Sequence, residues 1–404
     1  MRSLHNLLVV LVILISTSGS GKVSAQKVEL RVATWNLEWF NDHDVSDDSS
    51  RIGRDFAAPS RQDYDERLEA FAEAIHNLRP TILAVQEVEN ERVVQDLTDR
   101  LQQLYDLDYA VGFVRGHDSY TGQDVALLIE GDVPFEVNRF NFSEFRSDDD
   151  FKDLSKHLWV EITVAGEKIT LVNVHLVTNR DDRKRQARTL RAWTSEIASS
   201  DKLILLGDFN VGQRFNQTSP EGTMGIIRGF GTSATDDDLF DAHQWLGERA
   251  THVSGRELDR ILVSPALLDE AGLKLSAIDV HPDLSIRGDE DEGRQVNYLL
   301  PADEQDLSDH YPLIATFEIS SDESASDDED ARRDDQDASA IVGTTGSEDQ
   351  ESSSNEGERD LSEPSPIPKP TPTLTPEDEF TRGLVDLALS LIIVLLETVL
   401  DMIR

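Results

Sequence analysis

Short runs of β-branched and other apolar residues alternate along this chain with longer segments whose apolar residues recur at helical spacing. The short runs predict strands at 28–35, 82–85, 125–129, 158–164, 169–174, 203–206, 260–263 and 313–319. The longer segments predict helices at 61–78, 91–104 and 181–198. Strands and helices interleaved in this way predict a mixed α/β fold.

Polar segments separate these elements and indicate how the strands connect. The sequence Ala165-Gly166-Glu167 lies between two alternating strands and predicts a hairpin, so the sheet cannot be wholly parallel. Three polar stretches, at 41–60, 212–238 and 283–306, are longer than ordinary connections. We expect them to form loops around the rim of a site.

The two ends of the chain follow different patterns. Residues 1–25 have a basic start, a short apolar run and small residues before Gln26, which predicts a signal peptide and a secreted or periplasmic protein. Residues 320–379 are rich in Asp, Glu, Ser and Pro and predict a disordered linker. Residues 380–404 predict an apolar helix with a narrow acidic stripe. This helix is expected to self-associate or to contact a membrane surface, with a marginal span as the remaining alternative.

The formal charge of −41 refines this picture. Residues 26–319 keep a net charge of −27, so the α/β part is itself acidic. Binding to a polyanion normally depends on Lys and Arg, so a phosphate-bearing substrate would need a cation to meet it here. The alternative is that the charge only confers solubility. Because the chain has no cysteine, a disulfide framework and a thiolate zinc site are excluded.

Polar clusters interrupt the ends of several predicted strands. Asn36 and Glu38 lie two residues apart at the end of the first strand and therefore share a face. Glu87 ends the second strand and would point toward Asn36 if the two strands are neighbours. Oxygen ligands of this kind suit Mg²⁺, which commonly takes one or two carboxylates and keeps water for substrate phosphate to replace.

A second group of polar residues follows two later strands. His175 lies where an apolar strand ends, a place in which a lone histidine is more often structural than catalytic. Asp208 and Asn210 follow a glycine, where such residues commonly make only a turn or a cap. Their functional interpretation is that Asp208 takes a proton from an attacking water while Asn210 holds the water or the phosphate.

The last clusters are Asp259 and the tripeptide Ser308-Asp309-His310. Asp309 could form a couple with His310, or it could reach the metal while Asp259 orients the imidazole. In either arrangement His310 would stabilise charge in the transition state or protonate the leaving oxygen. Any one cluster is a weak indication, but five in this order point to one site.

In this order the clusters closely resemble those of the endonuclease/exonuclease/phosphatase superfamily, the deoxyribonuclease I-like fold. The resemblance covers residues 27–319. Five motifs carry it, at 35–38, 86–87, 207–210, 258–262 and 308–310. It implies an α/β (α+β) domain in which two mixed β-sheets pack face to face with helices outside, a four-layer sandwich.

The resemblance also implies roles. Glu87 would be the principal Mg²⁺ ligand, with Mn²⁺ as an alternative ion. The residues expected close to the metal or the phosphate are Asn36, Glu38 and Asp309. The residues expected to act in catalysis are His175, Asp208, Asn210, Asp259 and His310. Among these, Asp208 would activate the water and the two histidines would bind and protonate phosphoryl oxygens.

Four further residues near the motifs are candidates for contact with substrate: Arg115, Tyr120, Arg183 and Gln186. For the last two, solvation of a helix surface is the expected role.

The leading hypothesis is an exported Mg²⁺-dependent phosphodiesterase. Its expected substrate is nucleic acid, which would make it an extracellular endonuclease. A phospholipid (sphingomyelinase-like) or small-molecule phosphoesterase is the alternative, which the C-terminal apolar helix favours. A binding module without catalysis is the third interpretation. The complete set of catalytic residue types argues against it.

Overall fold

The computed structural model describes residues 27–44, 59–212, 219–246, 249–268, 273–287 and 304–320. Contacts divide the chain into two units, Met1–Arg332 and Arg333–Arg404, and every described residue belongs to the first. The predicted signal peptide, the linker beyond Ser320 and the C-terminal apolar helix lie outside the described residues and stay predictions. Within the described ranges, no helix combines the length and apolarity needed to cross a membrane.

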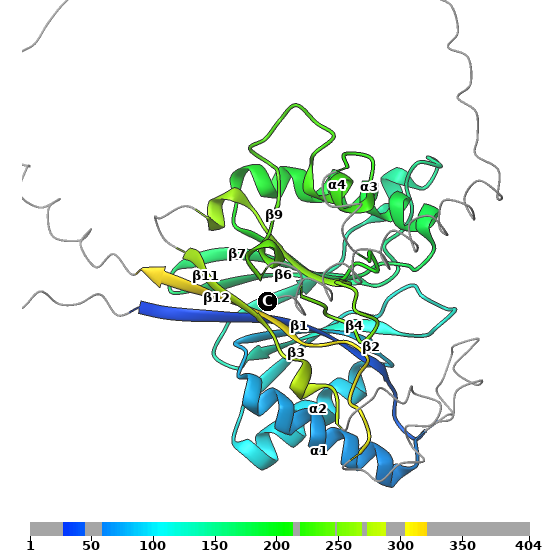
Figure 1. Cartoon of the computed structure of the whole chain (residues 1–404), viewed down its shortest axis with the longest axis vertical. Coiled ribbons are helices and arrows are strands. Elements are labelled where there is room, and N and C mark those ends of the chain that lie inside the picture. Colours follow the sequence, from blue (N-terminus) through cyan, green and yellow to red (C-terminus); the bar gives the residue numbers. More distant parts are fainter. Residues whose placement is uncertain are drawn as a thin grey trace, which may run out of the picture. The chain divides into compact units, whose positions relative to one another are not determined.

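The first of two central sheets has the strand order β11-β12-β1-β2-β4-β3 (Figure 1). Its strands are β1 (Lys27–Phe40), β2 (Ile82–Val88), β3 (Tyr109–Phe113), β4 (Asp124–Glu130), β11 (Leu273–Val280) and β12 (Leu313–Ser320). Strands β1 and β2 pair in parallel, and the other pairs are antiparallel. The sheet is therefore mixed.

The second sheet has the order β5-β6-β7-β8-β10-β9. Its strands are β5 (Phe135–Asn138), β6 (His157–Val164), β7 (Glu167–His175), β8 (Leu203–Asp208), β9 (Phe240–Asp241) and β10 (Asp259–Val263). Here β7 and β8 form the parallel pair. Strands β6 and β7 form the predicted hairpin, in which Ala165 and Gly166 both have positive φ, as a two-residue turn of this kind requires.

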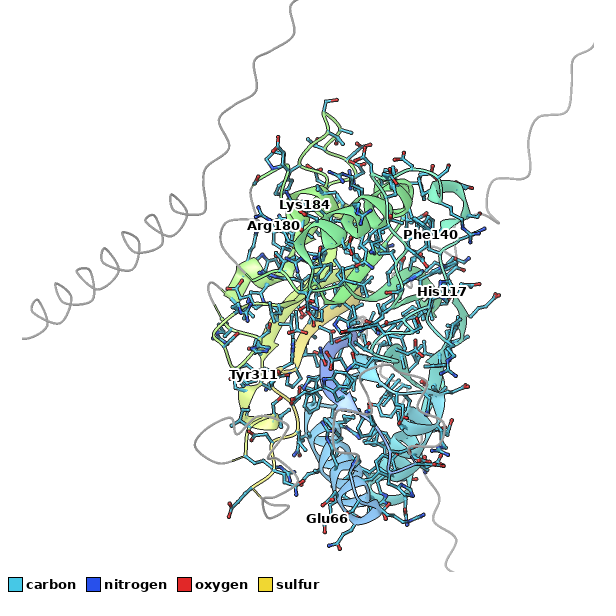
Figure 2. All side chains as sticks on the ribbon, turned by 90° about the vertical axis from the view of Figure 1, so that its right-hand side faces the viewer. Glu66, His117, Phe140, Arg180, Lys184 and Tyr311 are labelled. Atoms are coloured by element: carbon cyan, nitrogen blue, oxygen red, sulfur yellow. The ribbon has the colours of Figure 1, made fainter. Side chains whose placement is uncertain are left out.

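Helices cover the outer faces of both sheets. The α-helices are α1 (Arg61–Leu78), α2 (Glu91–Tyr105), α3 (Arg180–Ser200) and α4 (Thr223–Arg228). Short 3-10 helices are η2 (Phe142–Phe145), η3 (Ala242–Leu246), η4 (Pro265–Leu267) and η5 (Pro282–Leu284). Figure 2 shows the two helical layers at opposite ends, with Glu66 on α1 and Lys184 on α3.

Three apolar cores hold these layers together. The central core joins both sheets, with Leu127 of the first sheet and Leu171 of the second among its members. A second core packs α1 and α2 against the first sheet, and a third packs α3 and α4 against the second. The order helix, sheet, sheet, helix confirms the predicted four-layer sandwich.

The eight predicted strands and three predicted helices are all present. The prediction missed β3, β5 and β9, which are short and largely half-exposed. It also missed β11, because a bulge between Leu275 and Ala277 breaks the two-residue period of its apolar side chains. The stretch 212–238 was predicted as a loop, but it contains α4, whose six residues are too few to reveal a helical period.

Candidate active site

The parallel strands β1 and β2 end beside each other with distorted backbones. Strand β1 loses its register with β2 after Asn36, and β2 loses its register with β4 after Gln86. The residues at these bulges include Glu38, with a φ of 44°, and Glu87, with a φ of 60°. Non-glycine residues keep such conformations only where the surrounding structure holds them, often at functional sites.

The carboxylate of Glu87 is held by three donors. It accepts hydrogen bonds from the backbone N–H of Trp39 (3.1 Å), from Nε2 of Gln123 (2.7 Å) and from Nδ2 of Asn36 (3.2 Å). The same Nδ2 also donates to Oδ2 of Asp208 at 3.2 Å. Asn36 therefore links a carboxylate of the first sheet to one of the second.

The orientation of Asn36 bears on its predicted role as a metal ligand. Its Oδ1 accepts from the backbone N–H of Glu38 at 3.0 Å, so the amide nitrogen faces the two carboxylates. To offer its oxygen to a cation between them, the amide must rotate by half a turn. In the present orientation Asn36 positions the carboxylates.

Three neighbouring strands of the second sheet present one row of polar side chains. Asp208 on β8 lies in register with His175 on β7 and with Asp259 on β10. Residues in register on adjacent strands point to the same face. The predicted catalytic residues of this sheet are therefore neighbours because of strand pairing alone.

Strand β8 needs the glycine that precedes Asp208, because β8 and β7 lie very close together there, and a turn follows the strand. Gly207 has a φ of 131°, and a Cβ there would lie 2.0 Å from the carbonyl oxygen of Val174. Beyond the turn, the backbone N–H of Asn210 donates to Oδ1 of Asp208 at 2.7 Å, and its Nδ2 donates to the carbonyl of Leu176 at 2.8 Å. Asn210 thus holds Asp208 and the end of β7 together.

His310 is paired with Asp259. Its Nδ1 lies 2.8 Å from Oδ2 of Asp259, which is fully buried, whereas its Nε2 lies 3.8 Å from Oδ1 of Asp309. Of the two carboxylate partners considered for His310, the structure brings Asp259 into hydrogen-bond distance. Nε2 of His310 lies 3.9 Å from Oδ2 of Asp208.

His175 approaches Asp208 as well. Its Nε2 lies 3.5 Å from Oδ2 of Asp208 and 3.9 Å from Oε1 of Glu87. Its Nδ1 is buried and has no hydrogen-bond partner within the described part of the chain. Both histidines therefore lie close to the carboxylate of Asp208 through Nε2. They differ at Nδ1, which is paired with Asp259 in His310 and has no partner among the described residues in His175.

The pKa values of the two imidazoles are shifted in opposite directions. Burial lowers the pKa of His175 well below its usual value, and the charges of Lys156 and His310 lower it further. Burial alone would also lower the pKa of His310, but the carboxylates of Asp259, Asp208 and Asp309 together raise it well above its usual value. The shifts favour the imidazolium form of His310 and the neutral form of His175.

The pKa of Asp208 is raised to about 7. Burial is the largest cause, the positive charge of His310 opposes it, and the negative charges of Asp259 and Glu87 add to it. A carboxyl group with this pKa changes protonation state near neutral pH, which is where a general base is most effective.

The tripeptide at 308–310 closes the site over the end of β1. Ser308 Oγ donates to the carbonyl of Asn36 at 2.6 Å and accepts from the backbone N–H of His310 at 2.9 Å. The backbone N–H of Asp309 donates to Oε2 of Glu38 at 3.0 Å. Glu38 therefore helps to place the tripeptide.

Supporting residues beneath the site were not found from the sequence. Gln86 Nε2 donates to Oδ1 of Asn173 at 2.8 Å, which joins the two sheets below the site. Lys156 Nζ lies 3.2 Å from Oε1 of Gln123, the amide that holds Glu87. In the sequence these residues appear only as polar positions within or next to apolar strands. That pattern does not show whether a polar side chain forms a buried hydrogen bond between elements or lies on the surface.

The substrate-side candidates lie in different environments. Tyr120 is 59% exposed, so it is free to meet a substrate. Arg183 donates to the carbonyl of Thr178 at 2.7 Å and lies close enough to Asp208 to feel its charge. Gln186 is buried and holds the backbone N–H of Val177 at 2.9 Å. The expectation of a solvated helix surface was wrong for Gln186, which has a structural role.

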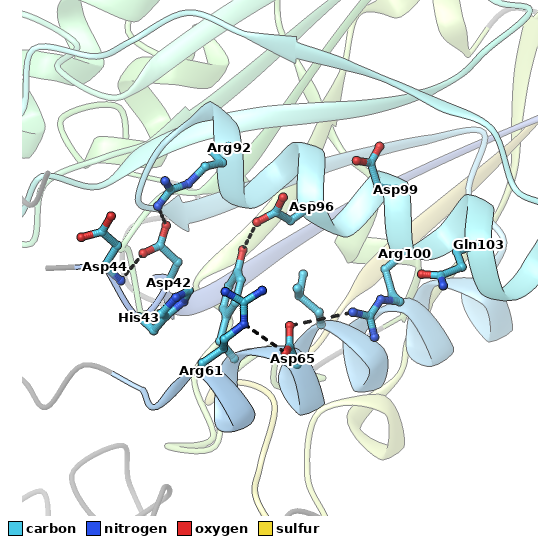
Figure 3. A pocket seen from close by; sticks show the side chains of 12 residues that line it. Asp42, His43, Asp44, Arg61, Asp65, Arg92, Asp96, Asp99, Arg100 and Gln103 are labelled. Carbon is cyan, nitrogen blue, oxygen red and sulfur yellow. Dashed lines mark hydrogen bonds and ion pairs between the residues drawn. The ribbon is translucent and has the colours of Figure 1, made fainter. Parts of the chain in front are cut away.

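A groove between α1 and α2 lies apart from these residues (Figure 3). Its walls carry paired charges, such as Arg92 with Asp42, and Arg61 with Asp65 at 3.9 Å. The hydroxyl of Tyr64 donates to Asp96 at 2.9 Å. None of the predicted site residues lines it, so we place no chemistry there.

The fold and this site agree with a known family. The profile of the Endonuclease/Exonuclease/phosphatase family matches residues 33–310, and this chain therefore belongs to that family. The family comprises endonucleases, exonucleases and phosphatases, which hydrolyse phosphoric ester bonds.

Individual relatives are more distant. A 5′-tyrosyl-DNA phosphodiesterase of Caenorhabditis briggsae is 28% identical over 204 residues, a match that covers 48% of each chain. The chain thus spans about half the length of this relative. An endonuclease/exonuclease/phosphatase from Bacteroides vulgatus is similar in structure, with 18% identity, a TM-score of 0.47 and coverage of 72% of this chain and 99% of that one. The catalytic domain of human nocturnin, solved with bound sulfate, has 18% identity, a TM-score of 0.46 and coverage of 73% and 98%.

Proposed function

We propose that this chain is an exported, Mg²⁺-dependent phosphodiesterase that cleaves nucleic acid. The observation that carries the proposal is the position of Asp208. Its carboxylate lies within 3.9 Å of both His175 and His310 and is joined to Glu87 through Asn36. A base, two imidazoles and a carboxylate of the kind that binds metal are thus gathered around one point, as hydrolysis by activated water requires.

The donor set suits a hard divalent cation. Glu87 offers a carboxylate at the end of β2, and Glu38 and Asp309 add carboxylates at the end of β1 and beside His310. Mg²⁺ prefers such oxygen ligands, and Mn²⁺ accepts the same set. When bound, the ion would act as a Lewis acid toward a phosphoryl oxygen.

The protein side chains handle the protons. Asp208 accepts a proton from the attacking water, and Asn210, whose Nδ2 lies 3.3 Å from Oδ2 of Asp208, keeps this carboxylate in place. Asp259 fixes Nδ1 of His310, so that Nε2 of the imidazolium donates to the oxygen that gains negative charge. His175, whose lowered pKa favours the neutral form, binds another phosphoryl oxygen.

Two observations favour nucleic acid as the substrate. The C. briggsae relative is named for a phosphodiester bond to DNA. In this acidic chain, the first six residues of α3 contain four basic residues and two aspartates, and α3 follows His175 by only a few residues. Basic side chains beside the site would meet the neighbouring phosphates of a polyanion.

A phospholipid or small-molecule phosphoester is the second candidate. The feature that favours a phospholipid is the predicted apolar helix at 380–404, which would bring the enzyme to a membrane surface. The same helix could instead drive self-association.

The test uses full-length protein with Mg²⁺ or Mn²⁺ and four substrates: plasmid DNA, RNA, sphingomyelin and bis-p-nitrophenyl phosphate. We expect cleavage of nucleic acid and of the small diester, and loss of both activities in EDTA. His310→Ala should lower kcat/KM by about 10²–10⁴-fold, because a positioned proton donor is lost. His76→Ala on α1 is the matched control and should keep activity.

Three outcomes would change the proposal. Activity that survives both EDTA and His310→Ala would refute the mechanism. Cleavage of sphingomyelin alone would replace nucleic acid with phospholipid. Export is tested separately, by the N-terminal sequence of protein recovered outside the cytoplasm, which should begin at Gln26.

A further inference from the structure

His252, a histidine that the sequence analysis did not select, lies beside Asp309 and His310 in the site. It forms an antiparallel bridge with His310. The backbone N–H of the next residue, Val253, donates to the carbonyl of Asp309 at 2.9 Å. Backbone pairing therefore places His252 beside two of the predicted site residues.

Hydrogen bonding defines the tautomer of His252. The backbone N–H of Ser254 donates to its Nδ1 at 2.9 Å. The turn that follows is closed by the N–H of Gly255, which donates to the carbonyl of His252 at 2.9 Å, and Gly255 has a φ of 76°. A neutral imidazole has one donor and one acceptor nitrogen, so Nε2 of His252 carries the proton.

This nitrogen lies beside Asp309. Nε2 of His252 lies 3.3 Å from Oδ2 of Asp309, and Oδ1 of Asp309 lies 3.8 Å from Nε2 of His310. The rings of the two histidines meet edge to face, with centroids 4.7 Å apart. Ligand atoms of these three residues all lie within 4.8 Å of one another. Because Nε2 of His252 is protonated, it offers no lone pair to a cation, and the three residues do not form a three-ligand metal site.

We propose that His252 is a positioning residue, which holds Oδ2 of Asp309 so that Oδ1 is directed toward the cation and the substrate phosphate. The inference rests on the proposed function, because it assigns Asp309 to the metal side. Carboxylates that bind metals are usually held by hydrogen bonds of their own, and losing such a partner typically costs about 10–100-fold in metal affinity or activity. His252 acts through Asp309 and need not touch the substrate.

The test compares variants of the full chain. His252→Gln keeps an N–H donor near the position of Nε2, His252→Phe keeps a ring against His310 without a donor, and His252→Ala removes both. The readouts are Mn²⁺ binding, followed by electron paramagnetic resonance, and separate values of kcat and KM for bis-p-nitrophenyl phosphate. Thermal melting checks that each variant is folded, and His252→Leu replaces the phenylalanine variant if that one is not.

We expect the phenylalanine and alanine variants to bind Mn²⁺ about 10–100-fold more weakly and to lose kcat, while the glutamine variant stays close to wild type. Equal Mn²⁺ affinity in all variants would overturn the inference alone. So would a phenylalanine variant that matches wild type while the glutamine variant fails, since ring packing would then be the role of His252. A wild-type protein that does not bind Mn²⁺ would overturn the proposed function and this inference together.

Discussion

The two sheets contribute to the site by different structural means. On the first sheet, Glu87 is presented by a bulge with a left-handed backbone and is held there by donors from Trp39, Asn36 and Gln123. On the second sheet, Asp208 belongs to regular pairing, in register with residues on both neighbouring strands. The residue proposed to bind the metal, Glu87, is thus positioned by a distorted backbone. The residue proposed to accept the proton, Asp208, is positioned by strand register.

This difference has an energetic consequence. A bulged residue with positive φ costs free energy, which its hydrogen bonds must offset. On the second sheet, burying Asp208 beside Asp259 costs free energy, and the raised pKa of Asp208 reflects its burial first and the neighbouring negative charge second. Substitutions on the two sheets should therefore affect activity and stability in different proportions.

The largest effect on activity is expected for Glu87→Gln. Glutamine keeps the size and one acceptor oxygen of the side chain but removes the charge that would bind the cation. Metal ions supply several kcal/mol of transition-state stabilisation, so kcat/KM should fall by about 10²–10⁴-fold. Part of the loss should be recovered at high Mg²⁺ concentration, which a metal titration of kcat would show.

Glu89→Gln is the matched control for that variant. Glu89 lies two residues farther along and accepts from the backbone N–H of Asp42 at 2.9 Å, away from Asp208 and the histidines. Its substitution should leave the metal dependence unchanged. If both variants lose activity equally, Glu87 has no special role in binding the cation.

Asp208→Asn should separate activity from stability on the second sheet. The folded-state pKa of about 7 exceeds the ordinary value of 3.8, so the folded protein binds this proton more tightly than the unfolded chain. Stability attributable to Asp208 is therefore greatest below about pH 4 and is lost as pH rises toward 7, by an amount on the order of a few kcal/mol. Asparagine removes this cost together with the base.

The expected result in EDTA is a higher Tm for Asp208→Asn than for wild type at pH 8, with the difference shrinking as pH falls to 5. Activity should be lost at every pH. A variant that melts below wild type at pH 8 would mean that Asn36 and Asn210 stabilise the charged carboxylate more than burial destabilises it.

The contrast between the sheets also explains what the sequence could predict about the fold and the site. His175 and Asp208 lie where apolar strands end and Asp259 lies where one begins, so those residues could be found from the sequence. Likewise, the resemblance of the motif order to a known family predicted the four layers. Strand β11 was missed because its bulge interrupts the period on which such predictions depend.

Residues that act only through tertiary contact could not be predicted in the same way. His252 lies outside any strand end with a recognisable motif, and its bridge to His310 joins segments separated by more than fifty residues. Gln186 has the polarity of a surface residue, yet α3 buries it. The choice between Asp259 and Asp309 as the partner of His310 also required a tertiary contact, the 2.8 Å approach of His310 Nδ1 to Oδ2 of Asp259.

The smallest of the three effects is expected for Gln123→Leu, which tests whether the bulge alone can hold Glu87. Gln123 donates to Oε2 of Glu87 and accepts from Lys156, so leucine removes the link between the two charges. Loss of a partner of this kind should weaken Mg²⁺ affinity by about 10–100-fold, with a smaller change in kcat at saturating metal. Gln102→Leu, on the exposed side of α2, is the control. Unchanged Mg²⁺ affinity in Gln123→Leu would show that the distorted backbone is sufficient, and the dependence of the first sheet on its side-chain donors would then be refuted.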